Sequence, residues 1–487
     1  MMPRMDTKSS NTTLAIRNST FGLLSLGCRL VGNMVVFIVI ARLPGIGASE
    51  FGQLTYAAAL TALFVMFSQF GLLPLLVRDI AADHSRLTSY ARSAFSLRIL
   101  LSLLGLTLMA LYIHNINMTG QSRLVCYIIA AAFYIGSFSA DFQTLFQSRE
   151  RMHLELFGIV TENVLLLVLA LLAFLFNPSI VQVACIFLLA KSVALVFNYI
   201  ICGRFLLWVY PRVDIGLCKK MLVEATPFAL AGVIATGIVQ LDTVLMRELS
   251  PGDSESAVGL YQAAIRLFLV PMLLPQIVLK VFLPQFSRMH GEKGPRLAHD
   301  LGRVNHILFT LGLLIGLTTV FRGNDLIRMF YGENLADAGP LLQILGFTIM
   351  MRFGAAYNLY FTIRNMVYLR VIFGLATLIA LIGFDFLLIP KYGAMGAAYS
   401  SVLAHIIYWI PFLGVLHLKE RMTLLGWRIG RALAAGVVMT AFLYLTSELH
   451  LLYMLPIYAV LVLAATFCSM RGEDRDKILT QLNLKST

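Results

Sequence analysis

The chain has 487 residues, of which 59% are apolar and only 13% are charged, and its mean hydropathy is +0.82. An ordinary soluble domain carries about 25% charged residues, so this composition excludes a water-facing globular protein. The formal net charge of +13 would suggest nucleic acid in a soluble protein. Here the basic residues gather in loops on one side of the apolar stretches, which is the pattern of cytoplasmic membrane-protein loops.

Apolar stretches recur from one end of the chain to the other, each long enough to cross the hydrocarbon core as a helix. Because lipid offers no partner to an unpaired backbone group, the chain is predicted to be an all-α polytopic membrane protein. The first stretch lacks a small-residue cleavage site and is expected to be a retained helix. The fourteen predicted spans are 14–42, 51–76, 90–113, 122–147, 154–176, 179–203, 222–247, 257–283, 304–322, 338–363, 367–389, 394–417, 428–447 and 451–470.

The distribution of Lys and Arg predicts that both termini are cytoplasmic. Most basic residues then fall in inner loops, and the reverse topology would place all of those loops outside. The basic inner segments are 78–92, 149–151, 204–220, 288–303, 364–370 and 419–431, followed by the tail after Arg471.

The sequence also repeats itself at an interval of about 205–215 residues. Phe51-Gly52-Gln53-Leu54 at the start of the second span is echoed by Val258-Gly259-Leu260-Tyr261 at the start of the eighth. Two further echoes link the fourth span to the tenth and the sixth to the twelfth. Chance similarity among apolar helices is the alternative, but three echoes in the same order favour two six-helix lobes around a central site.

This repeat defines the predicted domains. They are an N-terminal lobe at 14–203, a cytoplasmic linker at 204–221, a C-terminal lobe at 222–417, two additional transmembrane helices at 428–470 and a cytoplasmic tail at 471–487.

Charged residues inside the spans are the candidate functional residues, since charge in a membrane is costly and usually faces a cavity or a partner. Their bias is cationic. Guanidinium groups match phosphate oxygens two at a time and stay charged, so the pattern predicts a cavity that binds a multiply charged anion. The predicted cavity residues are Arg29, Arg98, Arg266, Arg352, Lys191 and His405.

Each of these residues has an alternative interpretation. An arginine can pair locally with an acid or extend its side chain to an interface, and Arg98 and Lys280 lie near enough to a span end for the latter. The acids inside spans are Asp141, Glu162, Asp242 and Asp385. Asp242 and Arg266 lie at similar depth on consecutive spans, so Asp242 is either a coupling site for protons or ions or a member of a structural ion pair.

Proline residues mark candidate hinges, because proline removes a helix hydrogen bond and bends the helix. They gather in the seventh and eighth spans as Pro227, Pro271 and Pro275, and Pro74 lies in the second. The sequence contains no recognisable catalytic constellation, nucleotide site or metal-binding cluster. The six cysteines are scattered, with no disulfide framework. We therefore expect no enzymatic activity and no cofactor.

Several of these segments resemble the Wzx-type polysaccharide and O-antigen flippases of the multidrug/oligosaccharidyl-lipid/polysaccharide exporter superfamily. The resemblance runs over roughly residues 14–470 and rests on moderately specific motifs. Those motifs are Ala41-Arg42, Glu50 to Leu54, Gly71-Leu72, Arg78 to Ala81, Gln240 to Leu245, Gly259 to Ala264 and Gly393 to Ala398.

The resemblance implies a flippase that moves undecaprenyl-pyrophosphate-linked oligosaccharide across the bacterial inner membrane for O-antigen or another surface polysaccharide, together with surface-polysaccharide assembly proteins. It assigns no fixed catalytic residues. The pyrophosphate would bind the cavity arginines and the polyprenyl tail would stay in the bilayer. A cation-coupled multidrug exporter of the same fold is the first alternative, although its cavity would more naturally carry acids. A membrane polymerase or ligase is the second.

Overall fold

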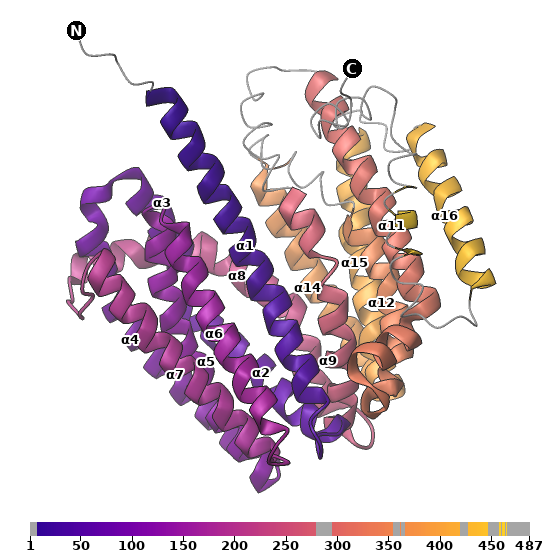
Figure 1. Ribbon diagram of the computed structural model, residues 1–487, viewed down its shortest axis with the longest axis horizontal. Helices are drawn as coiled ribbons and strands as arrows, with labels where there is room; N and C mark the ends of the chain where they lie inside the picture. The colour runs from indigo at the N-terminus through magenta and orange to yellow at the C-terminus, as the bar shows by residue number, and fades with distance from the viewer. Residues whose placement is uncertain are drawn as a thin grey trace. The chain divides into compact units, whose positions relative to one another are not determined.

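The computed structural model describes residues 7–278, 295–353, 361, 366–418 and 427–446, with 457–458, 460–462 and 464. Every regular element in these residues is a helix, which confirms the predicted all-α class (Figure 1). Eleven of the described helices are long and apolar enough to cross a membrane. The protein is therefore a multi-pass membrane protein. Most of the predicted span at 451–470, together with Lys280, Cys468 and the predicted tail, lies outside the described residues.

Packing divides the chain into two compact units. The first comprises residues 1–248 and 255–259, and the second comprises residues 249–254 and 260–487. This division places α8 (Ile215–Leu249), which corresponds to the predicted seventh span, almost wholly in the first unit. The predicted lobe boundaries come from the repeat and not from packing, so they stay a prediction.

The first unit contains the helices of the N-terminal half. They are α1 (Thr7–Ala41), α2 (Ala48–Gln69), α3 (Leu72–Ala82), α4 (Leu87–Asn115), α5 (Gly120–Ser148), α6 (Met152–Ala173), α7 (Ile180–Phe205) and α8 (Ile215–Leu249), with a short 3₁₀ turn at His84–Arg86.

Local sequence signals place the starts of these helices. Ser179 and Gln182 form a capping box at α7, in which each side chain bonds the other residue's backbone amide. Thr119 caps α5 by accepting a hydrogen bond from the Ser122 amide at 3.2 Å. At α2 the Glu50 carboxylate accepts from the Gly47 amide at 2.9 Å.

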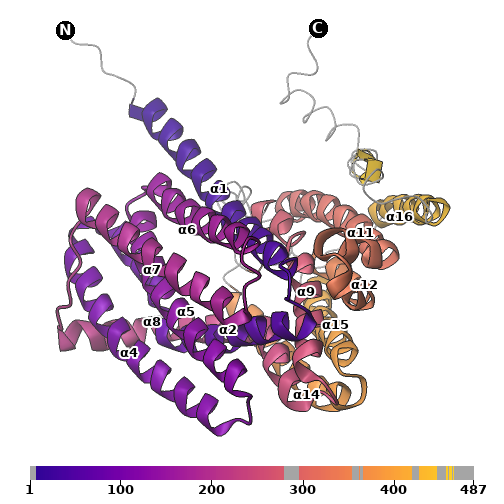
Figure 2. The ribbon, with the colours of Figure 1, turned by 60° about the horizontal axis from the view of Figure 1, so that its bottom comes forward.

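Helix α5 is the centre of the first unit and packs against α2, α3, α6 and α7. Helix α1 lies along α6, and the two remain side by side in both views (Figures 1 and 2). Both helices carry polar side chains within their predicted spans.

The predicted second span, 51–76, is too long. Helix α2 ends at Gln69, where Phe70 and Gly71 adopt left-handed backbone angles with φ of 42° and 67°. A Cβ atom at Gly71 would lie 2.5 Å from the Ala229 amide of α8, so only glycine fits this corner. Helix α3 then starts at Leu72, which puts Pro74 in its first turn, where proline is tolerated.

The second unit contains most of α9 (Ser254–Leu269), α11 (Pro295–Tyr331), α12 (Gly339–Arg352), α14 (Val367–Tyr392), α15 (Ala394–Leu418) and α16 (Trp427–Leu445), with a 3₁₀ segment at Glu333–Ala338. Within this unit α11 packs on α12 and α16, and α15 packs on α12 and α14. Helix α9 ends two residues before Pro271, and helical structure resumes over residues 273–278.

Candidate functional site

Arg29 of α1 lies at the centre of a polar network in the first unit. Its guanidinium donates to the Gln143 side chain at 3.1 Å and to the Glu155 carboxylate at 3.4 Å. Gln147 donates to the same carboxylate oxygen at 2.7 Å. The Glu155 side chain is nearly buried, whereas the Arg29 side chain is 49% exposed. A half-exposed guanidinium anchored on one side keeps N–H donors available for another partner.

Lys191 of α7 forms an ion pair with Glu162 of α6 at 2.6 Å, and its ammonium lies 4.9 Å from the centre of the Phe133 ring. The pair is mostly buried. Lys191 therefore fits the alternative interpretation given above, in which a membrane cation pairs with an acid nearby. Glu162 neutralises its charge within the same unit.

Arg98 of α4 is also paired. Its Nε donates to both carboxylate oxygens of Asp141 at 3.1 and 3.2 Å, and an Nη donates to Ser137 at 2.9 Å. The side chain is 1% exposed and lies at a small, mostly apolar pocket lined by residues of α3, α4 and α5. This burial favours a structural role for Arg98, while substrate binding by it stays a prediction.

In the second unit, α12 packs on α15, and Arg352 of α12 lies close enough to His405 of α15 for a Coulombic interaction between the two side chains. The Arg352 guanidinium lies 5.6 Å from the centre of the Phe268 ring. His405 is buried, and its Nδ1 lies 2.7 Å from the Ser401 carbonyl oxygen. Arg266 of α9 lies close enough to Tyr331 for a Coulombic interaction between the two side chains.

Asp242 is buried on α8 in the first unit. The contacts of the predicted cavity residues can be described within each unit. Arg29, Lys191 and Arg98 each have their own partners in the first unit, and Arg352 and His405 come together in the second. The described residues contain no group of three or more His, Cys, Asp or Glu side chains that could hold a metal ion.

A further polar cluster surrounds Glu255, in the part of α9 that belongs to the first unit. Its carboxylate accepts from Gln53 of α2 at 2.7 Å and from Ser122 of α5 at 2.7 Å, and it lies 3.7 Å from the Arg247 guanidinium. The cluster ties the starts of α2, α5 and α9 to the end of α8.

Two glycines, Gly52 and Gly259, allow the backbones of α2 and α9 to lie close together. A Cβ atom at Gly52 would overlap the Glu255 carbonyl oxygen, and one at Gly259 would overlap that of Ala48. The two overlaps are equivalent, because Gly52 and Gly259 are 207 residues apart, as are Ala48 and Glu255. The crossing therefore has local two-fold symmetry at the same interval as the sequence repeat.

Sequence reasoning missed Glu155 and Glu255 as members of these clusters. Glu155 lies just inside α6, seven residues before Glu162. Residues seven apart share a helix face, so this spacing was a usable signal. Glu255 gave no comparable signal, because its partners come from three other segments of the chain.

Comparison with known proteins decides the family. Residues 17–290, more than half of the chain, match the family described as polysaccharide biosynthesis protein. The chain belongs to this family. The capsular polysaccharide biosynthesis protein CapF of Staphylococcus aureus is 20% identical over 405 residues, which cover 80% of this chain and 95% of CapF.

Solved structures show the same fold. The lipid II flippase MurJ in an inward closed conformation matches with a TM-score of 0.68 at 16% identity, over 94% of this chain and 99% of MurJ. An inward-facing multidrug resistance MATE family transporter of the MOP superfamily matches with a TM-score of 0.60 at 14% identity, over 81% of this chain and 96% of the transporter. At these identities the likeness establishes the fold, which is that of flippases and transporters.

Proposed function

We propose that this member of the polysaccharide biosynthesis family is a flippase for lipid-linked oligosaccharides in the bacterial inner membrane. The substrate would be an undecaprenyl-pyrophosphate-linked repeat unit of O-antigen or another surface polysaccharide, moved from the cytoplasmic to the periplasmic leaflet. The observation that carries the proposal is the family match over residues 17–290. Translocation would proceed by alternating access to a cationic cavity, without enzymatic chemistry or a cofactor, and with both termini cytoplasmic.

The cations inside the spans support an anionic substrate. Arg29 combines a predicted mid-span position with a half-exposed side chain and two polar anchors. A guanidinium held in this way is oriented before the substrate arrives, which lowers the entropy cost of binding a pyrophosphate.

The direct test is a deletion strain in which lipid-linked repeat units are assigned to a leaflet by their accessibility to an added glycosidase. The proposal expects intact repeat units to accumulate on the cytoplasmic side and to reach the other side when the gene is restored. Accumulation on the periplasmic side, with polymer absent, would indicate a polymerase or ligase instead and would contradict the proposal.

A cation-coupled multidrug exporter is the second candidate, because the MATE transporter shares the fold. That function predicts increased sensitivity of the deletion strain to cationic drugs, with normal surface polymer. The same strain therefore discriminates between the two functions.

The first prediction concerns Arg29 and Arg352. Replacing either residue with Ala should reduce apparent substrate affinity by about ten- to a hundredfold, since a charge-assisted hydrogen bond contributes about 1.5–3 kcal/mol. Arg→Lys variants should recover only part of the transport, because Lys keeps the charge and loses the planar fork. Complementation of surface-polymer synthesis at matched expression measures both. Full complementation by both Ala variants would refute the cationic-cavity mechanism.

The second prediction concerns Asp242, whose side chain is buried. If its ionisation is coupled to transport, Asp242→Asn should slow flipping at normal expression, because the amide cannot release a proton. If it serves only in a structural ion pair, the variant should mainly lower expression. Initial flipping rates normalised to protein amount distinguish these outcomes, and a variant normal in both measurements would exclude both roles.

A further inference from the structure

The connection between α7 and α8 is a defined surface of the first unit, which we call the linker surface (Arg204–Lys220). Its middle is fixed on the helices beneath it. Val209 is buried, Trp208 packs edge-on against Tyr199 with ring centres 5.3 Å apart, and the Arg92 guanidinium lies 3.7 Å from the centre of the Tyr210 ring. The side chains of this surface therefore have set positions.

The position of the linker surface between two candidate membrane spans predicts that it lies at the depth of the lipid headgroups. It joins the ends of two helices that are each long and apolar enough to span a membrane. Helix α8 has 35 residues, or about 52 Å at 1.5 Å per residue, whereas the hydrocarbon core is about 30 Å thick and the whole bilayer about 40–45 Å. A helix of this length extends beyond the hydrocarbon, and its first turns, which carry Lys219 and Lys220, are expected in the headgroup layer.

The linker surface presents large apolar side chains outward. Val213 and Ile215 are 71% and 79% exposed, and about half of each of three aromatic side chains is exposed, namely Phe205, Trp208 and Tyr210. Water would make such exposure costly. Trp and Tyr are, however, the residues enriched where a membrane protein meets the headgroups, since their rings are apolar and their edges are polar.

The same surface carries uncompensated positive charge. Arg204, Arg212 and Lys219 are exposed and form no ion pair within the described part of the chain. The linker surface has four basic residues and one acid, Asp214. The Asp214 carboxylate accepts a hydrogen bond from the Leu217 amide at 3.0 Å. Its net charge is therefore +3.

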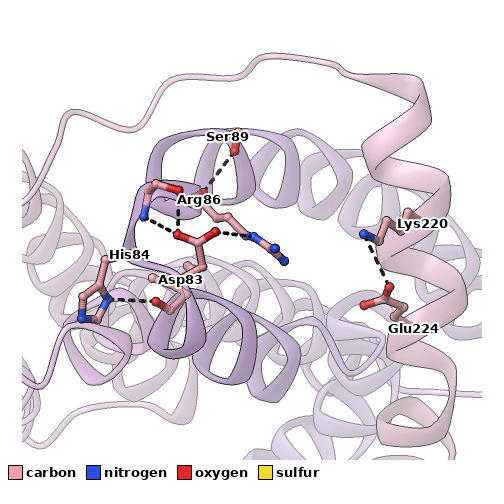
Figure 3. A network of polar contacts seen from close by, with 8 residues as sticks. Asp83, His84, Arg86, Ser89, Lys220 and Glu224 are labelled. Atoms are coloured by element: carbon pink, nitrogen blue, oxygen red, sulfur yellow. Dashed lines mark hydrogen bonds and ion pairs between the residues drawn. The ribbon is translucent and has the colours of Figure 1, made fainter.

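Nearby acids are already neutralised (Figure 3). Asp83 pairs with Arg86 at 2.9 Å, and hydrogen bonds from Ser85 lower the pKa of its carboxyl below the usual range, so it stays ionised and paired. Glu224 lies 2.9 Å from Arg78 and 3.9 Å from Lys220. These acids leave little negative charge to offset Arg204, Arg212 and Lys219.

We propose that the linker surface is a binding site for the headgroups of anionic phospholipids. The aromatic rings would insert between headgroups while Arg204, Arg212 and Lys219 contact lipid phosphates. Anionic lipid is favoured over a soluble partner because the surface combines headgroup depth, exposed apolar side chains and net positive charge. This inference does not depend on what the protein transports.

Trp208 provides the test, since the chain has only three Trp residues. In a Trp409→Phe/Trp427→Phe background, Trp208 is the sole tryptophan. The full-length protein is reconstituted into phosphatidylcholine vesicles that contain an increasing fraction of one brominated lipid. This lipid is either brominated phosphatidylglycerol or brominated phosphatidylcholine, and in both the bromine lies near the headgroup end of the acyl chain. Quenching of Trp208 fluorescence then reports which lipid gathers at the linker surface.

The expected result is quenching by brominated phosphatidylglycerol at a several-fold lower mole fraction than by brominated phosphatidylcholine. Each basic residue near an anionic surface contributes about 1 kcal/mol, or about fivefold. Arg212→Gln/Lys219→Gln should therefore remove most of this several-fold preference and leave quenching by phosphatidylcholine unchanged. The matched control, Arg328→Gln/Lys391→Gln, removes two exposed charges from the second unit and should keep the preference.

Three outcomes would overturn the proposal. The first is equal quenching of the parent protein by the two brominated lipids. The second is absence of quenching by either lipid, which would place Trp208 in water or under another protein segment. The third is an equal loss of preference in the test and control variants, which would indicate the general charge of the protein and not the linker surface.

Discussion

Replacing Arg98 with Ala should destabilise the protein by about 3–5 kcal/mol, because it leaves the Asp141 carboxylate buried without its counter-ion. The Arg98 side chain is 1% exposed and its Nε donates to both Asp141 oxygens, so the variant loses both hydrogen bonds to the carboxylate. Thermal unfolding of the purified protein can be followed with a thiol-reactive dye that labels the buried thiols of Cys126 and Cys202 as they become exposed. We expect these thiols to react at a clearly lower temperature in the variant.

The matched control for Arg98 is the double variant Arg98→Met/Asp141→Leu, which replaces both charges with apolar groups of similar size. Its stability should return to near that of the parent, since replacing a whole buried pair is often neutral. Transport by a stable double variant would show that Arg98 does not bind substrate. A double variant as unstable as the single one would contradict the interpretation of the pair as charge compensation.

Replacing Gly259 with Leu should prevent α9 from packing against α2. Any side chain at Gly259 overlaps the Ala48 carbonyl oxygen, and backbone atoms cannot move aside as a flexible side chain can. The shift would also separate Glu255 from Gln53 and Ser122. Overpacking alone costs about 1–3 kcal/mol and sometimes more, so with the lost hydrogen bonds we expect about 3 kcal/mol or more. Folded protein recovered after detergent extraction, and transport at matched amounts, measure the effect.

The same substitution at Gly383 is the control for Gly259. A Cβ atom there meets no atom within 4 Å, although Gly383 also lies inside a membrane helix, α14. Gly383→Leu should leave both yield and transport near normal. Gly52→Leu should resemble Gly259→Leu, because the two overlaps are equivalent. If Gly259→Leu behaved like Gly383→Leu, α2 and α9 would not cross as closely as described.

The sequence by itself determined the fold class and most helix positions. Apolar stretches of about 20 residues leave the backbone no partner but itself, so helices were the only solution in lipid. The predicted ends of α5 and α7 differ from those in the structure by at most two residues. In the structure the side chains of Thr119 and Ser179 cap the starts of these two helices. The error at 51–76 arose because Phe70 and Gly71 turn the chain inside an apolar run, where hydropathy gives no warning.

Only the tertiary structure decided which membrane charges have partners. Hydropathy placed Arg29, Arg98 and Lys191 in spans but could not tell whether a carboxylate from another helix lies within 3–4 Å. The structure gives Arg98 and Lys191 enclosed acidic partners and leaves Arg29 half exposed. The physical reason is that an ion pair depends on helix rotation and on contacts between distant segments, as between Arg29 and Glu155, 126 residues apart, whereas hydropathy depends only on neighbours along the chain.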